Sequence, residues 1–235
     1  MWIEFDNERI PVLRLLLVPI VFFAAGDVVL TLLQTAGVSV PEMAFLSLDL
    51  GIEGGVPTFY SSAQLMLAAG LLGVIWARKA AKGDRQRWGW MLLTLGFVFL
   101  SLDELASLHE EWGSLARGTV RREGFFRFRW IAVALALLPL VTVVFLPLLR
   151  SLPARFRRDF IVAGAIFIGS AVLLEGLGGM VLTRGGADTV GYNLLNVVEN
   201  GGEMVGIALF VTALLRYIAA VVPHPHGRRD VAATA

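Results

Sequence analysis

Ionisable residues inside apolar stretches are the part of this chain whose types and positions point most directly to chemistry. An ionised side chain at the centre of a lipid bilayer costs at least about 2.5 to 3.5 kcal/mol, so each one suggests a functional role. No lysine or arginine lies at the same depth to neutralise the acids. They therefore need a proton, water or a bound cation. The residues concerned are Asp27, Asp103, Glu104, His109, Glu175, Glu199 and Glu203.

The spacing of Glu199 and Glu203 suits the chelation of one ion. Residues four apart share a helix face and are separated by about 6 Å along the axis. Asn196 falls on the same face. One divalent ion could therefore bridge this helix and the helix that carries Asp103 and Glu104.

A second stripe is expected on the helix that contains Asp103. Asp103, Ser107 and Glu110 follow the i, i+4, i+7 pattern of one helix face. Asp103 and Glu110 would then be about 10.5 Å apart along the axis, which is too far to hold one ion without a partner helix.

The ligand types limit the possible occupants. Oxygen ligands with at most one imidazole favour Mg, Ca, Mn or Fe(II) over copper. A single histidine near the apolar stretches excludes haem held by two histidines, and the absence of cysteine excludes iron–sulfur clusters. Protons are the alternative occupant, because like charges brought together can share a proton. The expected metal ligands are Glu199, Glu203, Asp103, Glu104, Glu175 and His109.

Composition indicates the setting of this site. The 235 residues are 57% hydrophobic and only 17% charged, against about 25% charged in a typical soluble domain. One membrane-spanning helix takes about 20 apolar residues. Apolar runs that do not alternate favour helices. We expect an all-α, polytopic transmembrane bundle of about six helices, with a single domain over 1–221 and a disordered tail over 222–235. The expected spans are 11–36, 59–76, 88–108, 130–149, 160–182 and 193–218.

Alternation of the spans places the ionisable residues in one layer. Those of the first, third and fifth spans lie in the later halves, and those of the sixth lie in the earlier half. Up-and-down crossing then brings them to the same side of the membrane, whichever way the protein inserts. The residues expected to support this layer are Asp27, Ser61, Ser62, Glu110 and Asn196.

Lysine and arginine counts give an orientation. With six crossings both termini lie on one side, and that side holds fourteen of the twenty Lys and Arg residues. Cytoplasmic connections carry such an excess. We expect an integral membrane protein of the bacterial inner membrane with both termini cytoplasmic and the polar layer on the outer side. The net charge of +1 gives no indication of a nucleic-acid partner; the expected partners are the lipid bilayer and a membrane subunit or a second copy of the chain.

Glycines accompany the carboxylates in two places. Gly176, Gly178 and Gly179 follow Glu175, and a Gly-Gly pair separates Glu199 from Glu203. Small residues allow helix backbones to approach closely, and they also allow a helix to unwind locally. Both interpretations stay open at this stage.

Three segments carry a resemblance. Residues 57–62 (Pro-Thr-Phe-Tyr-Ser-Ser), residues 100–104 (Leu-Ser-Leu-Asp-Glu) followed by His109 and Glu110, and Glu199 with Glu203 and Met204 are similar to segments of uncharacterised bacterial six-helix multi-pass membrane proteins. The resemblance brings no activity. It implies that the three segments belong to one site.

Three functions are compatible with these patterns. The first is transport or sensing through a carboxylate site that binds a divalent cation or protons. The second is a metal-dependent membrane enzyme acting on a lipid-like substrate, which would need a lateral opening at the depth of Ser61 and Glu203. The third is a structural subunit whose acids pair with basic residues of a partner chain.

Overall fold

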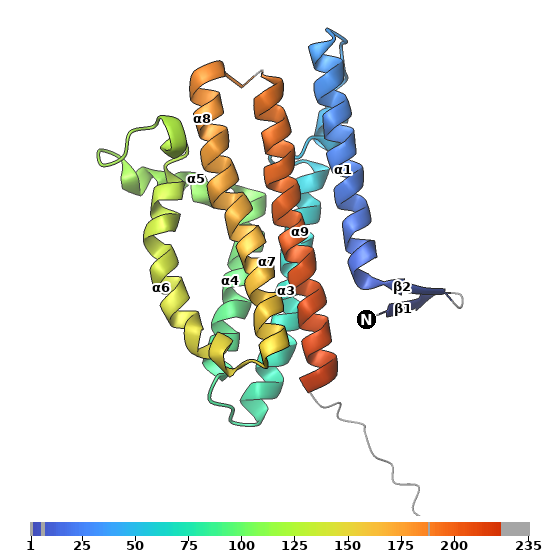
Figure 1. Ribbon diagram of the computed structural model, residues 1–235, viewed down its shortest axis with the longest axis vertical. Helices are drawn as coiled ribbons and strands as arrows, with labels where there is room; N and C mark the ends of the chain where they lie inside the picture. Colours follow the sequence, from blue (N-terminus) through green and yellow to red (C-terminus); the bar gives the residue numbers. More distant parts are fainter. Residues whose placement is uncertain (1, 6–7, 188, 222–235) are drawn as a thin grey trace, which may run out of the picture.

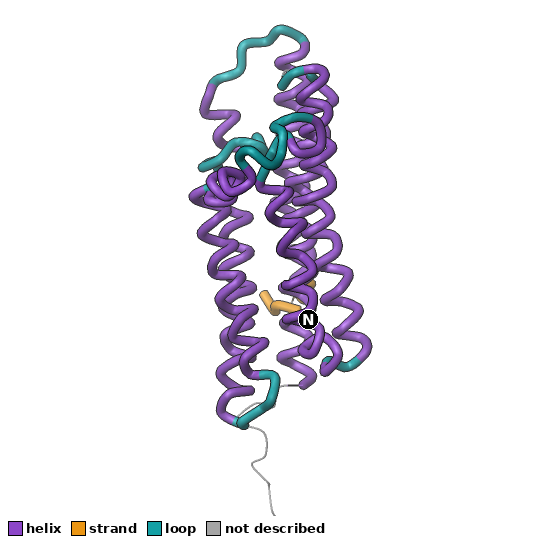
Figure 2. The backbone as a smooth tube through the Cα atoms, turned by 90° about the vertical axis from the view of Figure 1, so that its left-hand side faces the viewer, coloured by secondary structure: helices purple, strands orange, loops and turns teal. Residues whose placement is uncertain are grey.

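The computed structural model describes residues 2–5, 8–187 and 189–221, which form an elongated helical bundle (Figure 1). The long helices run along one axis, and the connections lie mainly toward the two ends (Figure 2). The expected tail over 222–235 lies outside the described residues. The elements are β1 (Trp2–Phe5), β2 (Glu8–Pro11), α1 (Val12–Thr35), α2 (Glu42–Leu48), α3 (Val56–Ala81), α4 (Arg87–Ala106), α5 (Leu108–Trp112), η1 (Gly113–Ala116), η2 (Gly124–Phe126), α6 (Trp130–Ser151), α7 (Ala154–Ile168), the π-helical turn η3 (Gly169–Leu174), α8 (Glu175–Gly185) and α9 (Val190–Val221).

Six helical segments among these residues are long and apolar enough to cross a membrane, and they confirm the expected bundle. They are α1, α3, α4, α6, the continuous run α7–η3–α8, and α9. The start of α1 and the end of α9 lie at the same end of the bundle (Figure 1). The two short N-terminal strands pair antiparallel next to α1. They do not change the all-α class.

Helix α9 is the centre of the packing. It contacts α1, α3 and α7, and Val211 and Leu214 on it are fully buried. Aromatic side chains join it to its neighbours, with the rings of Phe97 and Phe210 stacked at 4.9 Å between centroids. Burial of large apolar side chains between helices therefore holds α9 in the middle of the bundle.

Glycines allow the closest helix approaches. A Cβ atom at Gly206 would lie 2.7 Å from the backbone nitrogen of Phe167 on α7, and one at Gly202 would overlap the Ser170 side chain. On α8, a Cβ atom at Gly179 would lie 2.8 Å from the carbonyl oxygen of Gly124. Of the two interpretations of these glycines, close packing holds at these positions.

The expected continuation of α4 past residue 107 is wrong. The helix ends at Ala106, and Ser107 adopts the left-handed conformation with φ 50° and ψ 38° before the separate helix α5 begins. The cause is local: a carboxylate oxygen of Asp103, Oδ1, accepts a hydrogen bond from the backbone N–H of His109 at 2.6 Å. The predicted stripe of Asp103, Ser107 and Glu110 therefore does not exist, and Glu110 is exposed.

Candidate functional site

The side chains of Asp103 and His109 lie at ion-pair distance from each other at the junction of α4 and α5. Besides its contact with the His109 backbone, the Asp103 carboxylate has its Oδ2 atom 3.2 Å from His109 Nδ1. Burial of the imidazole lowers the pKa of His109. The hydrogen bond and charge of Asp103, and the charges of Glu175 and Glu110, outweigh this, so the pKa of His109 is raised above its ordinary value. The pair places a titratable imidazole at one edge of the polar layer.

Glu175 is held by the start of α6. The indole N–H of Trp130 donates to Glu175 Oε1 at 2.9 Å, and the Trp130 ring lies edge-on to the His109 ring at 5.1 Å between centroids. Glu175 begins α8 directly after the π-helical turn η3. Such turns change the direction in which the following side chains project, and they are frequent at functional sites. Glu175 is therefore joined to His109 through Trp130.

The serines of α3 have different positions. Ser61 is buried, and its hydroxyl faces the carboxylate of Glu104 on α4. Ser62 faces Ser101: its hydroxyl donates to the Ser101 carbonyl at 2.8 Å, and the Ser101 hydroxyl donates to the Ser62 carbonyl at 3.0 Å. Ser62 thus fastens α3 to α4, and Ser61 contacts the acidic group itself.

The α9 acids face the other carboxylates. Glu199 is buried, with 9% of its surface exposed, and its Oε2 lies 3.8 Å from the position that a Cβ atom at Gly178 would occupy. The Glu203 carboxylate lies within electrostatic range of Glu104, Glu199 and Glu175, and also of Asp103. The six predicted ligands therefore gather in one region, which we call the acidic cluster: Asp103, Glu104, His109, Glu175, Glu199 and Glu203.

The residues of the cluster come from four helices. Two residues come from α4, two from α9 and one each from α5 and α8, while α3 and α6 supply the hydrogen-bond donors. Within the described residues, no lysine or arginine forms an ion pair with its carboxylates. In the same part of the chain, no three His, Asp or Glu side chains are close enough together to hold one metal ion.

Asp27 lies apart from this cluster. It is buried in α1, where its Oδ2 accepts a hydrogen bond from the backbone N–H of Leu50 at 2.9 Å. Its acidic neighbour is Asp49, at the end of α2. Asn196 also faces this region, since Asn196 and Asp27 both line one polar pocket. The side-chain oxygen of Asn196 accepts a hydrogen bond from Asn200 at 3.1 Å.

Two side chains that sequence reasoning did not place in the site are Trp130 and Asp49. Trp130 marks the start of a span, a position typical of interfacial tryptophan, and nothing in the sequence indicates a bond to a residue 45 positions away. Asp49 lies in a polar connection, where an acid is unremarkable. Both contacts depend on the tertiary arrangement.

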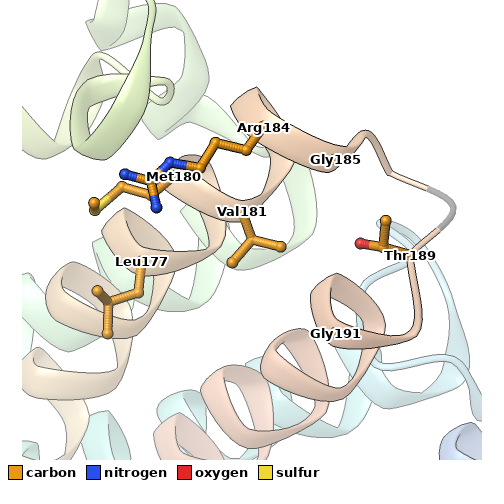
Figure 3. Close-up of a pocket in the computed structure, with 7 residues that line it drawn as sticks. All are labelled: Leu177, Met180, Val181, Arg184, Gly185, Thr189 and Gly191. Carbon is orange, nitrogen blue, oxygen red and sulfur yellow. The ribbon is translucent and has the colours of Figure 1, made fainter.

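A pocket between α8 and the start of α9 does not include any residue of the cluster. Its volume is about 430 Å³, and its lining is mainly apolar, with Arg184 as the charged residue (Figure 3). The lining residues come from α8 and from the start of α9: Leu177, Met180, Val181, Arg184, Gly185, Thr189 and Gly191. None of the predicted site residues lines it.

A comparison with known protein families assigns the chain to a family. Residues 14–217 match the family described as Domain of unknown function (DUF8692). The chain belongs to this family. The DUF8692 match covers nearly all of the six spans and every residue of the acidic cluster. The family description carries no activity, as the sequence resemblance implied. Searches of curated proteins and of solved structures found no match.

Proposed function

We propose that the acidic cluster of this DUF8692 membrane protein binds and releases cations, with protons as the main occupant, in transport or sensing. The observation that carries the proposal is the gathering of five carboxylates and one imidazole from four helices, without an ion-pairing lysine or arginine among the described residues. Chains of Asp, Glu and His inside membranes are typical of proton pathways.

Neutral or titratable donors support protons as the occupant. Glu175 has the Trp130 indole, Glu104 has the Ser61 hydroxyl, and Asp103 has the His109 ring. These donors satisfy only part of the hydrogen-bonding capacity of the carboxylates, and the second oxygens of Glu175 and Glu104 can hold a shared proton. Titration of one member then changes the proton affinity of the others, as coupled sites do.

A hard divalent ion is the second candidate occupant. Glu199 and Glu203 lie one helical turn apart on α9, and Glu175 and Glu104 lie within electrostatic range of Glu203. Mg, Ca, Mn or Fe(II) would suit oxygen ligands of this kind. In this candidate Glu199 and Glu203 would form the chelating pair, with Asp103, Glu104, Glu175 and His109 around it.

The proposed setting is the bacterial inner membrane with both termini in the cytoplasm and the cluster in the outer leaflet. The distribution of lysine and arginine along the chain supports this orientation.

The first prediction concerns Glu203. In infrared difference spectra taken between neutral and alkaline pH in mild detergent, a range in which exposed carboxylates stay ionised, the wild type should show the C=O stretch of a protonated carboxylic acid. Glu203→Gln should weaken that band because it removes one carboxylate of the cluster. Glu111→Gln is the matched control, since Glu111 is exposed on α5.

Elemental analysis of the same samples, prepared without a metal-affinity tag, separates the two occupants. A stoichiometric metal in the wild type that is absent from the Glu199→Gln, Glu203→Gln double variant would establish the divalent ion instead of protons. A Glu203→Gln spectrum equal to wild type, with no metal in either protein, would contradict both candidates and leave a structural subunit as the better description.

A further inference from the structure

A polar pocket lies at the end of the bundle opposite the described chain ends, between the end of α1, the α2 segment and the start of α9 (Figure 1). Its volume is about 250 Å³. It is separate from the acidic cluster, since none of the six cluster residues lines it. The lining residues are Asp27, Leu30, Thr31, Gln34, Phe45, Asp49, Gly51, Ile52, Ala187, Tyr192, Asn193 and Asn196.

The charge of the pocket lining is negative. Asp27 and Asp49 line it together, and no lysine or arginine does. Asp27 is 5% exposed, and its Oδ2 accepts the Leu50 N–H. No described residue donates a hydrogen bond to its second oxygen, Oδ1. Because Asp27 lines the pocket, a ligand in the pocket can supply a donor to this carboxylate.

The turn after α2 fixes the geometry of the second acid. Asp49 Oδ1 accepts a hydrogen bond from the Gly51 N–H at 2.8 Å, so the carboxylate is held at the pocket wall. A Cβ atom at Gly51 would overlap the side-chain nitrogen of Asn196. Glycine at this position therefore lets the α9 amide lie directly against the turn.

The neutral lining favours a ligand rich in N–H donors. Gln34, Asn193 and Asn196 offer amide oxygens, and Thr31 offers a hydroxyl oxygen. The rings of Phe45 and Tyr192 add aromatic surface, which attracts ammonium groups. Carboxylates, amide oxygens and aromatic rings together are the surroundings that an organic ammonium ion prefers.

The volume points to a molecule larger than a single atom. About 30 Å³ corresponds to one water molecule in the liquid, so the pocket has room for roughly eight. Its lining holds two carboxylates, and among the described residues no third Asp, Glu or His side chain joins them in a group that could hold a metal ion. A short carbon chain with an ammonium group at one end or at both fills this space and supplies a donor to each acid.

Tyr192 connects this pocket with the acidic cluster. It lies on the first turn of α9 and lines the pocket. The charges of Glu199 and Glu175 in the cluster and of Asp49 in the pocket all act on its hydroxyl. A cation in the pocket would therefore change the electrostatic surroundings that Tyr192 shares with the cluster.

We propose that the pocket lined by Asp27 and Asp49 binds a small organic cation that carries one or two ammonium groups. Binding at this pocket requires no activity of the acidic cluster, so the two proposals can fail separately.

The test uses equilibrium dialysis of the purified full chain in mild detergent with radiolabelled putrescine, a four-carbon diamine, and with butanediol as its uncharged analogue. The wild type should bind putrescine saturably, and unlabelled butanediol should not displace it. Asp27→Asn and Asp49→Asn should each weaken putrescine binding about tenfold or more, because each removes a charged hydrogen-bond acceptor. Asparagine keeps an oxygen for the backbone donors, so the fold is retained.

Glu42→Gln is the matched control, since Glu42 is an exposed acid in the first turn of α2 and does not line the pocket. Its putrescine affinity should stay within about twofold of wild type. Should Asp27→Asn unfold in a detergent melting assay, Asp49→Asn in the half-buried turn carries the comparison alone. Absence of saturable binding in the wild type, displacement by butanediol, or an Asp49→Asn protein that binds like wild type would overturn the proposal. Putrescine binding that persists in Glu203→Gln would show that the pocket works apart from the cluster.

Discussion

At the scale of single residues, the contact between Asp103 and His109 depends on the conformation of Ser107. In a continuous helix two residues six positions apart point in different directions. The left-handed Ser107 ends α4 and turns the chain back, so that one carboxylate accepts both a backbone N–H and a ring contact of His109. The left-handed backbone of Ser107, which non-glycine residues rarely adopt, thus brings Asp103 and His109 of the acidic cluster together.

The titration of His109 tests this contact. Because the pKa of His109 is raised, its imidazole stays protonated above the ordinary value of about 6.5, and the stabilisation from the ion pair is lost as the pH rises through the raised pKa. In histidine-labelled protein, the NMR signal of His109 should therefore titrate above this value, and Asp103→Asn should lower the midpoint. His109→Gln identifies the signal. A midpoint that Asp103→Asn leaves unchanged would mean that the pair does not form.

The gathering of the acids could be predicted from the sequence, but their individual partners could not. Alternating spans place Glu175 and Glu203 at the same depth with no knowledge of tertiary structure. The bond from Trp130 to Glu175 and the bond from Leu50 to Asp27 join residues 45 and 23 positions apart. Such contacts follow from how the helices are rotated and packed, which hydropathy does not encode.

At the scale of elements, hydropathy predicts the long helices and misses the short ones. All six expected spans are found, with boundaries that differ by a few residues. The seven-residue α2 and the five-residue α5 are too short for a periodic signal. The π-helical turn η3 has no recognised sequence pattern, although its position directly before Glu175 affects the direction of that side chain.

The packing of α9 against α7 predicts different effects of alanine substitution at two glycines of α9, Gly206 and Gly201. Gly206→Ala should lower the stability by about 1 to 3 kcal/mol, because the new methyl group would meet the Phe167 backbone. Gly201→Ala should be neutral or stabilising by up to about 1 kcal/mol, since a Cβ atom there meets nothing within 4 Å and alanine favours the helix. Thermal unfolding in detergent measures both. Equal melting temperatures for the two variants would contradict this account of the contact.

At the scale of the whole molecule, the polar features share one end of the bundle. The pocket lies opposite the described chain ends, and the acidic cluster is linked to it through Tyr192. The connection between α3 and α4 lies at the other end, where Lys79 pairs with Asp84 at 2.7 Å. By the alternation of the six spans, the side with the α3–α4 connection is also the side that holds fourteen of the twenty Lys and Arg residues.

Orientation can be measured directly because the chain contains no cysteine. Lys82→Cys, in the α3–α4 connection, and Thr119→Cys, in the connection before α6, are both exposed. In intact cells a membrane-impermeant maleimide should label Thr119→Cys and should reach Lys82→Cys only after the cells are opened. The reverse pattern would place the pocket and the cluster on the cytoplasmic side.

The central place of α9 also bears on biosynthesis. The ribosome makes α9 after the other five spans, at roughly 5 to 20 residues per second, so Asp27 is synthesised roughly 9 to 35 s before Glu203. During that interval α1, α3 and α4 carry their buried acids and serines without the neighbour that later covers them. Newly inserted chains must therefore shelter these groups from lipid, by water, by protonation or by an insertion factor, until α9 arrives.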